Sequence, residues 1–108
     1  MRGSKETCSI FLDVLPSESV KPGDIVASVR RARAVDLNHW TDAIGSVYIV
    51  TSSRVARTRD GSPRPGGRLR NMLECLRGTM ADVQAAELDP DFAGRIWRIW
   101  WYPRGKRK

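Results

Sequence analysis

The chain has 108 residues, of which 41% are apolar and 29% charged, a composition typical of one globular domain with a single hydrophobic core. No apolar run approaches the eighteen residues of a membrane span, and residues 1–6, expected to be a flexible N-terminus, lack the apolar centre of a signal peptide. We therefore expect a cytoplasmic protein that does not bind membranes.

The net charge of +7 is unevenly distributed along the chain. Residues 1–53 hold six basic and six acidic side chains, whereas residues 54–108 hold thirteen basic and six acidic ones. Fifteen of the basic residues are arginines, which form paired hydrogen bonds with phosphate and stack on rings, although a GC-rich genome would also favour arginine. The asymmetry points to a polyanion or an acidic protein surface as the partner.

The first half of the chain predicts two strands joined by a turn. Apolar residues alternate over residues 7–15, and the loop that follows ends in the turn Pro22-Gly23. A second strand is expected over residues 24–34. The basic run at its end either protects an exposed sheet edge or faces a ligand; it contains Arg30, Arg31 and Arg33.

A third strand and a basic loop are expected next. A strand is expected over residues 45–56, and the hydrophobic, β-prone run at residues 46–51 favours a central position in the sheet. Residues 57–68 are rich in arginine, glycine and proline and have no apolar anchor, so they predict a flexible surface loop. Such a loop either reaches a phosphate backbone or simply connects sheet and helix.

One amphipathic helix is predicted from residue 68 to 87. Leu69, Leu73 and Leu76 recur at helical spacing and would pack against the sheet. Gly78 interrupts the pattern, and Thr79 could cap a second short helix. Gly66 and Gly67, directly before the predicted helix, fit either an anion site at the helix N-terminus or a plain helix entry.

A final strand is predicted over residues 94–102, followed by a basic tail at 103–108. Alternation places Trp97 and Ile99 on one face and Arg98, Trp100 and Tyr102 on the other. One face can belong to the core. The other has the composition of a stacking surface for bases or of a protein interface.

Motifs for catalysis and cofactor binding are missing from the sequence. His39 is the one imidazole, with Asp36 and Asp42 as its nearest carboxylates, and there is no P-loop or dinucleotide fingerprint. Cys8 and Cys75 lack metal-ligand spacing, and we interpret them as small buried residues without a disulfide. We expect no cofactor, no metal and no enzymatic activity.

Together these patterns predict an α+β domain with three or four mainly antiparallel strands, or a partly closed barrel, packed by one amphipathic helix. The favoured function is non-enzymatic binding of DNA or RNA. The alternatives are a small interaction module or inhibitor, of the kind phages and plasmids encode, that docks on an acidic protein surface or pairs edge to edge as a homodimer, and a metal-independent RNase.

The predicted nucleic-acid contacts are cations along the second strand, the basic loop, the final strand and the tail, with two aromatic side chains for stacking. These candidates are Arg30, Arg31, Arg33, Arg57, Arg59, Arg64, Arg68, Arg95, Arg98, Trp100, Tyr102, Arg104, Lys106, Arg107 and Lys108.

Overall fold

The computed structural model describes residues 6–30, 44–56 and 65–101, and all structural statements below refer to these ranges. They form a small α+β fold, as the sequence predicts. The elements in chain order are β1 (Thr7–Val14), β2 (Ile25–Arg30), β3 (Ile44–Val55), a 3₁₀ turn (Pro65–Gly67), β4 (Leu69–Gly78), α1 (Met80–Leu88) and β5 (Ile96–Trp101).

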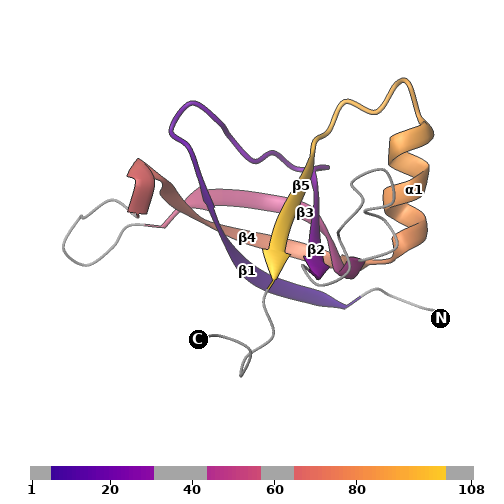
Figure 1. Ribbon diagram of the computed structural model, residues 1–108, viewed down its shortest axis with the longest axis horizontal. Coiled ribbons are helices and arrows are strands. Elements are labelled where there is room, and N and C mark those ends of the chain that lie inside the picture. The colour runs from indigo at the N-terminus through magenta and orange to yellow at the C-terminus, as the bar shows by residue number, and fades with distance from the viewer. Residues whose placement is uncertain (1–5, 31–43, 57–64, 102–108) are drawn as a thin grey trace.

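The five strands form one mixed sheet in the order β1-β4-β3-β2-β5 (Figure 1). β1–β4, β4–β3 and β3–β2 pair antiparallel, whereas β2 and β5 pair in parallel. The expectation of three or four strands is therefore wrong. The sheet is also not closed, because no pairing joins β1 and β5, its two edges in the described part of the chain.

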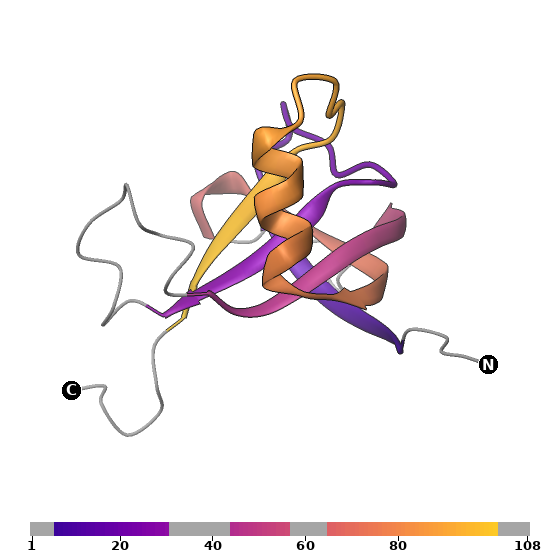
Figure 2. The ribbon, with the colours of Figure 1, turned by 90° about the vertical axis from the view of Figure 1, so that its right-hand side faces the viewer.

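The sheet has two faces with separate cores. On the inner face, Val26, Val50 and Leu73 are buried, and residues of both edge strands pack against this cluster. The outer face is covered by α1 over β2 and β3, where Val47 packs with the fully buried Val83 of the helix (Figure 2). β2 is an interior strand, and its four apolar residues, Ile25, Val26, Ala27 and Val29, are all buried. Arg30 at its end therefore does not protect a sheet edge.

The predicted helix over residues 68–87 is wrong in its first half. Leu69–Gly78 form β4, which lies between β1 and β3, and only Met80–Leu88 are helical. As a result, Gly66 and Gly67 precede a strand, and they do not form an anion site at a helix N-terminus.

Two overlapping apolar patterns explain the error. Leu73 and Cys75 face the inner core at the strand period of two, but the same side also buries the polar Asn71. Met72 and Leu76 on the opposite side are half-buried apolar residues, and with Leu73 they imitate a helical stripe. An interior strand with two apolar faces therefore has the same pattern as an amphipathic helix.

The change from strand to helix occurs at Gly78. A Cβ atom at this position would lie 3.0 Å from Val47 Cγ1 and 3.2 Å from Asp82 Oδ2, so only glycine fits without a shift of its neighbours. The backbone N–H of Thr79 then donates to the Asp82 carboxylate at 2.7 Å. This contact begins α1 where the sequence places the possible second cap.

The parallel pair of β2 and β5 is fixed at its start by the carboxylate of Asp24, which is 3% exposed. Oδ1 accepts the backbone N–H of Arg95 at 3.0 Å. Oδ2 accepts the backbone N–H of Lys21 and the indole Nε1–H of Trp97, both at 3.0 Å. The predicted Pro-Gly turn is present beside it, with Gly23 at a φ of +96°. One buried carboxylate thus binds the turn, β2 and β5 together.

We expect the substitution Asp24→Asn to lower the free energy of unfolding by about 2–3 kcal/mol. An amide has one acceptor oxygen in place of two, so its NH₂ group would face an N–H donor in a buried site. Urea unfolding followed by tryptophan fluorescence measures the loss. Asp91→Asn, at an exposed carboxylate, is the control and should change the midpoint little. Equal stability of the two variants would contradict this role of Asp24.

Candidate nucleic-acid interface

The excess positive charge of the protein lies outside the described residues. The described residues carry eight basic and nine acidic side chains, whereas residues 1–5, 31–43, 57–64 and 102–108 carry eleven basic and three acidic ones. The described part of the chain is therefore nearly neutral as a whole. What the fold contributes to an interface is the position of the strand ends from which the basic segments continue.

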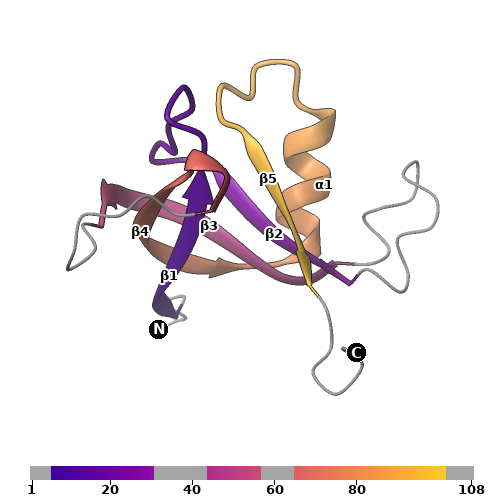
Figure 3. The ribbon, with the colours of Figure 1, turned by 60° about the vertical axis from the view of Figure 1, so that its left-hand side comes forward.

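The parallel pairing of β2 with β5 brings two of these strand ends together. Arg30 at the end of β2 pairs in register with Trp101 at the end of β5, so residues 31–33 and the tail that begins at Tyr102 continue from adjacent positions. The end of β3 at Val55, where the chain continues toward residues 57–64, lies at the opposite end of the sheet (Figure 3). The fold thus places the starting points of the basic segments after β2 and β5 side by side. The segment after β3 starts at the opposite end of the sheet.

Beside these paired strand ends, the inner face carries two exposed arginines and a tyrosine. Arg77 of β4 is the register partner of Tyr48 of β3, and its Cζ lies 5.6 Å from the centroid of the half-buried ring. The alternation of β2 places Arg30 on the same face, beyond the half-buried pair Ser28 and Ser46. We call Ser28, Arg30, Ser46, Tyr48 and Arg77 together the basic end.

The cations of the basic end are not neutralised within the described residues. Neither Arg30 nor Arg77 forms an ion pair there, in contrast to Arg70 and Arg95. The acidic neighbour is Glu6, whose backbone carbonyl accepts the Arg77 N–H at 2.8 Å and whose exposed side chain forms no ion pair with Arg77. Two available guanidinium groups, two hydroxyls and a ring suit an anionic ligand with flat groups.

β5 has one face that packs in the core and one exposed arginine on the other face. Trp97 packs against the inner core and donates to Asp24, and the guanidinium of Arg95 lies 4.4 Å from its ring while pairing with Glu18 at 2.9 Å. Trp97 and Ile99 therefore form the core face that alternation predicts. Arg98 points to the other side and is exposed.

Four predicted contact residues have described side chains. Arg30 belongs to the basic end, Arg68 is exposed directly before β4, and Arg95 and Arg98 lie on β5. Trp100 lies in β5, but its side chain is outside the described residues. Asp36, His39 and Asp42 lie outside the described ranges. So do the remaining contact candidates, which are Arg31, Arg33, Arg57, Arg59, Arg64, Tyr102, Arg104, Lys106, Arg107 and Lys108.

Sequence reasoning missed Tyr48 and Arg77. Arg77 falls within the predicted helix over residues 68–87, and Tyr48 lies in the hydrophobic run that predicts a central strand, so neither is among the predicted contacts. A strand period of two over residues 71–77 was the available signal, since it places Arg77 on the same face as Leu73 and Cys75.

Cys8 and Cys75 are register partners on β1 and β4, and both are free thiols. Cys75 is buried and Cys8 half-buried, in agreement with a packing role. No group of three or more His, Cys, Asp or Glu side chains within the described ranges is arranged to hold a metal ion. No helix in the same ranges has the length and apolar character needed to cross a membrane.

We compared the chain with protein-family models, with curated proteins and with solved structures, and none of them matches it.

We expect Cys75 to react slowly with an alkylating reagent in the folded protein. Burial, followed by the charges of Cys8 and Glu74, raises the pKa of Cys75 to about 11, so at pH 8 roughly one thiol in a thousand is ionised. The rate of modification by iodoacetamide, resolved for each cysteine by mass spectrometry, should rise about tenfold per pH unit from pH 8 to pH 10. A rate that levels off below pH 9 would contradict the raised pKa.

Proposed function

We propose that this protein binds nucleic acid without catalysing a reaction on it, and that the basic end is the fixed part of the binding surface. The observation that carries the proposal is the parallel pairing of β2 and β5, which ends at Arg30 and Trp101. Because of this pairing, the two basic segments that follow these residues begin at adjacent positions, beside Arg77. Backbone phosphates would contact Arg30 and Arg77 together with the arginines and lysines of residues 31–33 and 104–108.

Aromatic groups supply the second requirement of the proposal. Tyr48 presents a half-buried ring at the basic end, and Trp100 and Tyr102 come at the end of β5 in the sequence. Stacking on such rings is tolerant of base identity, so we expect weak sequence preference and tighter binding to single strands than to duplexes. The near-neutral charge of the described residues as a whole also agrees with affinity that depends mainly on the basic segments outside them.

The main competing function, docking on an acidic protein surface, would use the same cations. The two functions differ in their ligand and in their response to salt, because a polyanion releases condensed counterions when it is bound. Titration of labelled single- and double-stranded DNA and RNA, followed by fluorescence anisotropy at two salt concentrations, separates them. No binding to any of the four ligands at low salt would overturn the nucleic-acid proposal and favour a protein partner.

We expect Arg77→Ala and Arg30→Ala each to weaken binding several-fold and to reduce the slope of log K against log salt by about one. Each variant removes one phosphate contact from the proposed surface. The matched control is Arg54→Ala, which removes the same charge from an exposed position of the outer face. Glu6→Gln should have the opposite effect, because it removes a negative charge beside Arg77.

These variants distinguish a localised site from a general effect of net charge. Equal losses for Arg54→Ala and Arg77→Ala would contradict the basic end as the binding surface, even if the protein binds nucleic acid. Changing Arg59, Arg64 and Arg98 to alanine together tests the contribution of the loop and of β5 in the same assay.

A further inference from the structure

The outer edge of β1 directs backbone groups away from β4. Arg77 N–H donates to the Glu6 carbonyl, and the antiparallel ladder then directs the backbone groups of every second residue of β1 toward β4. The alternate residues direct their N–H and C=O groups away from the sheet; they are Thr7, Ser9, Phe11 and Asp13. No strand in the described part of the chain pairs with this edge.

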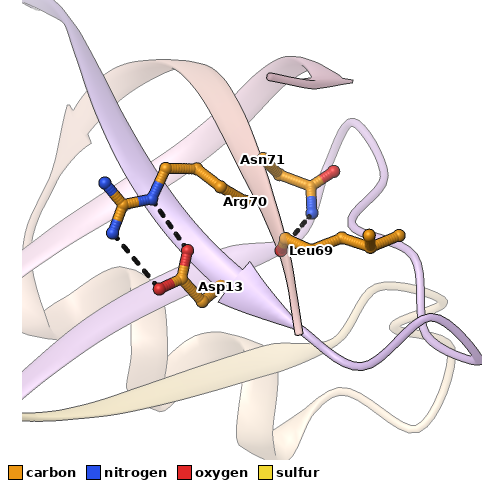
Figure 4. Close-up of polar contacts among 4 residues, drawn as sticks. All are labelled: Asp13, Leu69, Arg70 and Asn71. Carbon is orange, nitrogen blue, oxygen red and sulfur yellow. Dashed lines mark hydrogen bonds and ion pairs between the residues drawn. The ribbon is translucent and has the colours of Figure 1, made fainter. Parts of the chain in front are cut away.

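β1 lacks the features by which proteins protect sheet edges. It is eight residues long, contains no proline or lysine, and pairs with β4 without a bulge, whereas the pairings of β3 with β2 and with β4 both contain one. Its one charged residue, Asp13, is held by the Arg70 guanidinium in two contacts of 2.9 and 3.2 Å (Figure 4). This hydrogen bond raises the pKa of Arg70, and the guanidinium and the Asp13 carboxylate form an ion pair.

A large apolar side chain lies in the middle of this edge. Phe11 is 55% exposed, with the guanidinium carbon of Arg70 at 5.4 Å from its ring centroid. On the same outer face, Ser9 donates to the Glu74 carboxylate at 2.9 Å. The edge is therefore polar, nearly neutral and centred on an exposed ring, which does not suit a polyanion.

We propose that β1 pairs antiparallel with β1 of a second copy of this chain, so that the two sheets form one continuous sheet across a twofold axis. The chain's own edge fits this occupant. When the axis passes beside Ile10, Thr7 of each copy lies opposite Asp13 of the other and Ser9 lies opposite Phe11. Every outward-facing residue of both strands is then paired, and no like charges oppose one another.

The other exposed edge suits self-pairing poorly. β5 carries the exposed Arg98 in its centre and leads toward the basic residues 104–108. Two β5 strands side by side would bring like charges together. The homodimer therefore uses β1, and the basic ends take no part in this pairing because their residues lie on β2, β3 and β4.

The test is the mass of the full chain by sedimentation equilibrium as a function of concentration. We expect twice the 12.2 kDa chain mass at concentrations of about 100 µM, and a return to the monomer mass on dilution. The variant Ser9→Pro removes an outward N–H from each copy without affecting the ladder to β4, and should raise the dissociation constant at least about tenfold. Circular dichroism checks that this variant is folded.

The matched control is Ser9→Ala, which loses the same bond to Glu74 but keeps the backbone N–H, and should stay within about twofold of the unmodified protein. A wild-type chain that remains at 12.2 kDa throughout the concentration range overturns the proposal, whether or not Ser9→Pro folds. A dimer that persists in folded Ser9→Pro overturns it as well, since another surface must then be used. Nucleic-acid binding is measured separately and does not depend on either result.

Discussion

The carboxylate of Asp24 is the constraint on which the rest of this structure depends. It accepts three N–H groups, from the turn before β2, from the backbone at the start of β5 and from the Trp97 indole, and it is almost fully buried. The backbone N–H of Ile25 also donates to the Arg95 carbonyl at 2.8 Å, which continues the same junction. β2 and β5, which Asp24 links across 71 residues of sequence, are thereby aligned from their first residues. Their parallel register continues to the other end of the pair, at Arg30 and Trp101.

This alignment connects the fold to the proposed function. A parallel strand beside β2 must enter at the same end and leave at the same end, so the residues after Trp101 begin next to those after Arg30. Arg77 and Tyr48 lie beside that point because β3 and β4 present them on the inner face. The described part of the chain is nearly neutral as a whole, and it determines where two basic segments begin. In the proposed function, affinity and salt dependence would come mainly from the arginines and lysines of those segments.

The sequence predicts those elements whose pattern is local. β1 and β3 agree with the alternation and β-propensity of residues 7–15 and 45–56, and the helix start at Thr79 agrees with its capping residues. β4 was misread because Asn71 occupies an inward position and apolar residues occupy outward ones. The parallel β2–β5 pair could not be predicted, because its register depends on the contacts of Asp24 with residues far along the chain. Tyr48 and Arg77 could not be grouped before β4 was known, because they meet through the register of β3 with β4.

The most direct test of this account is photocrosslinking of a single-stranded oligonucleotide that contains 5-iodouracil, followed by mass spectrometry of the crosslinked peptides. The account predicts crosslinks to Tyr48 and to the peptides that contain residues 30–33 and 100–108. Competition with unlabelled oligonucleotide should abolish them. Crosslinks concentrated on Phe11 of β1 or on the surface of α1, with none at Tyr48 or the C-terminal peptide, would contradict it.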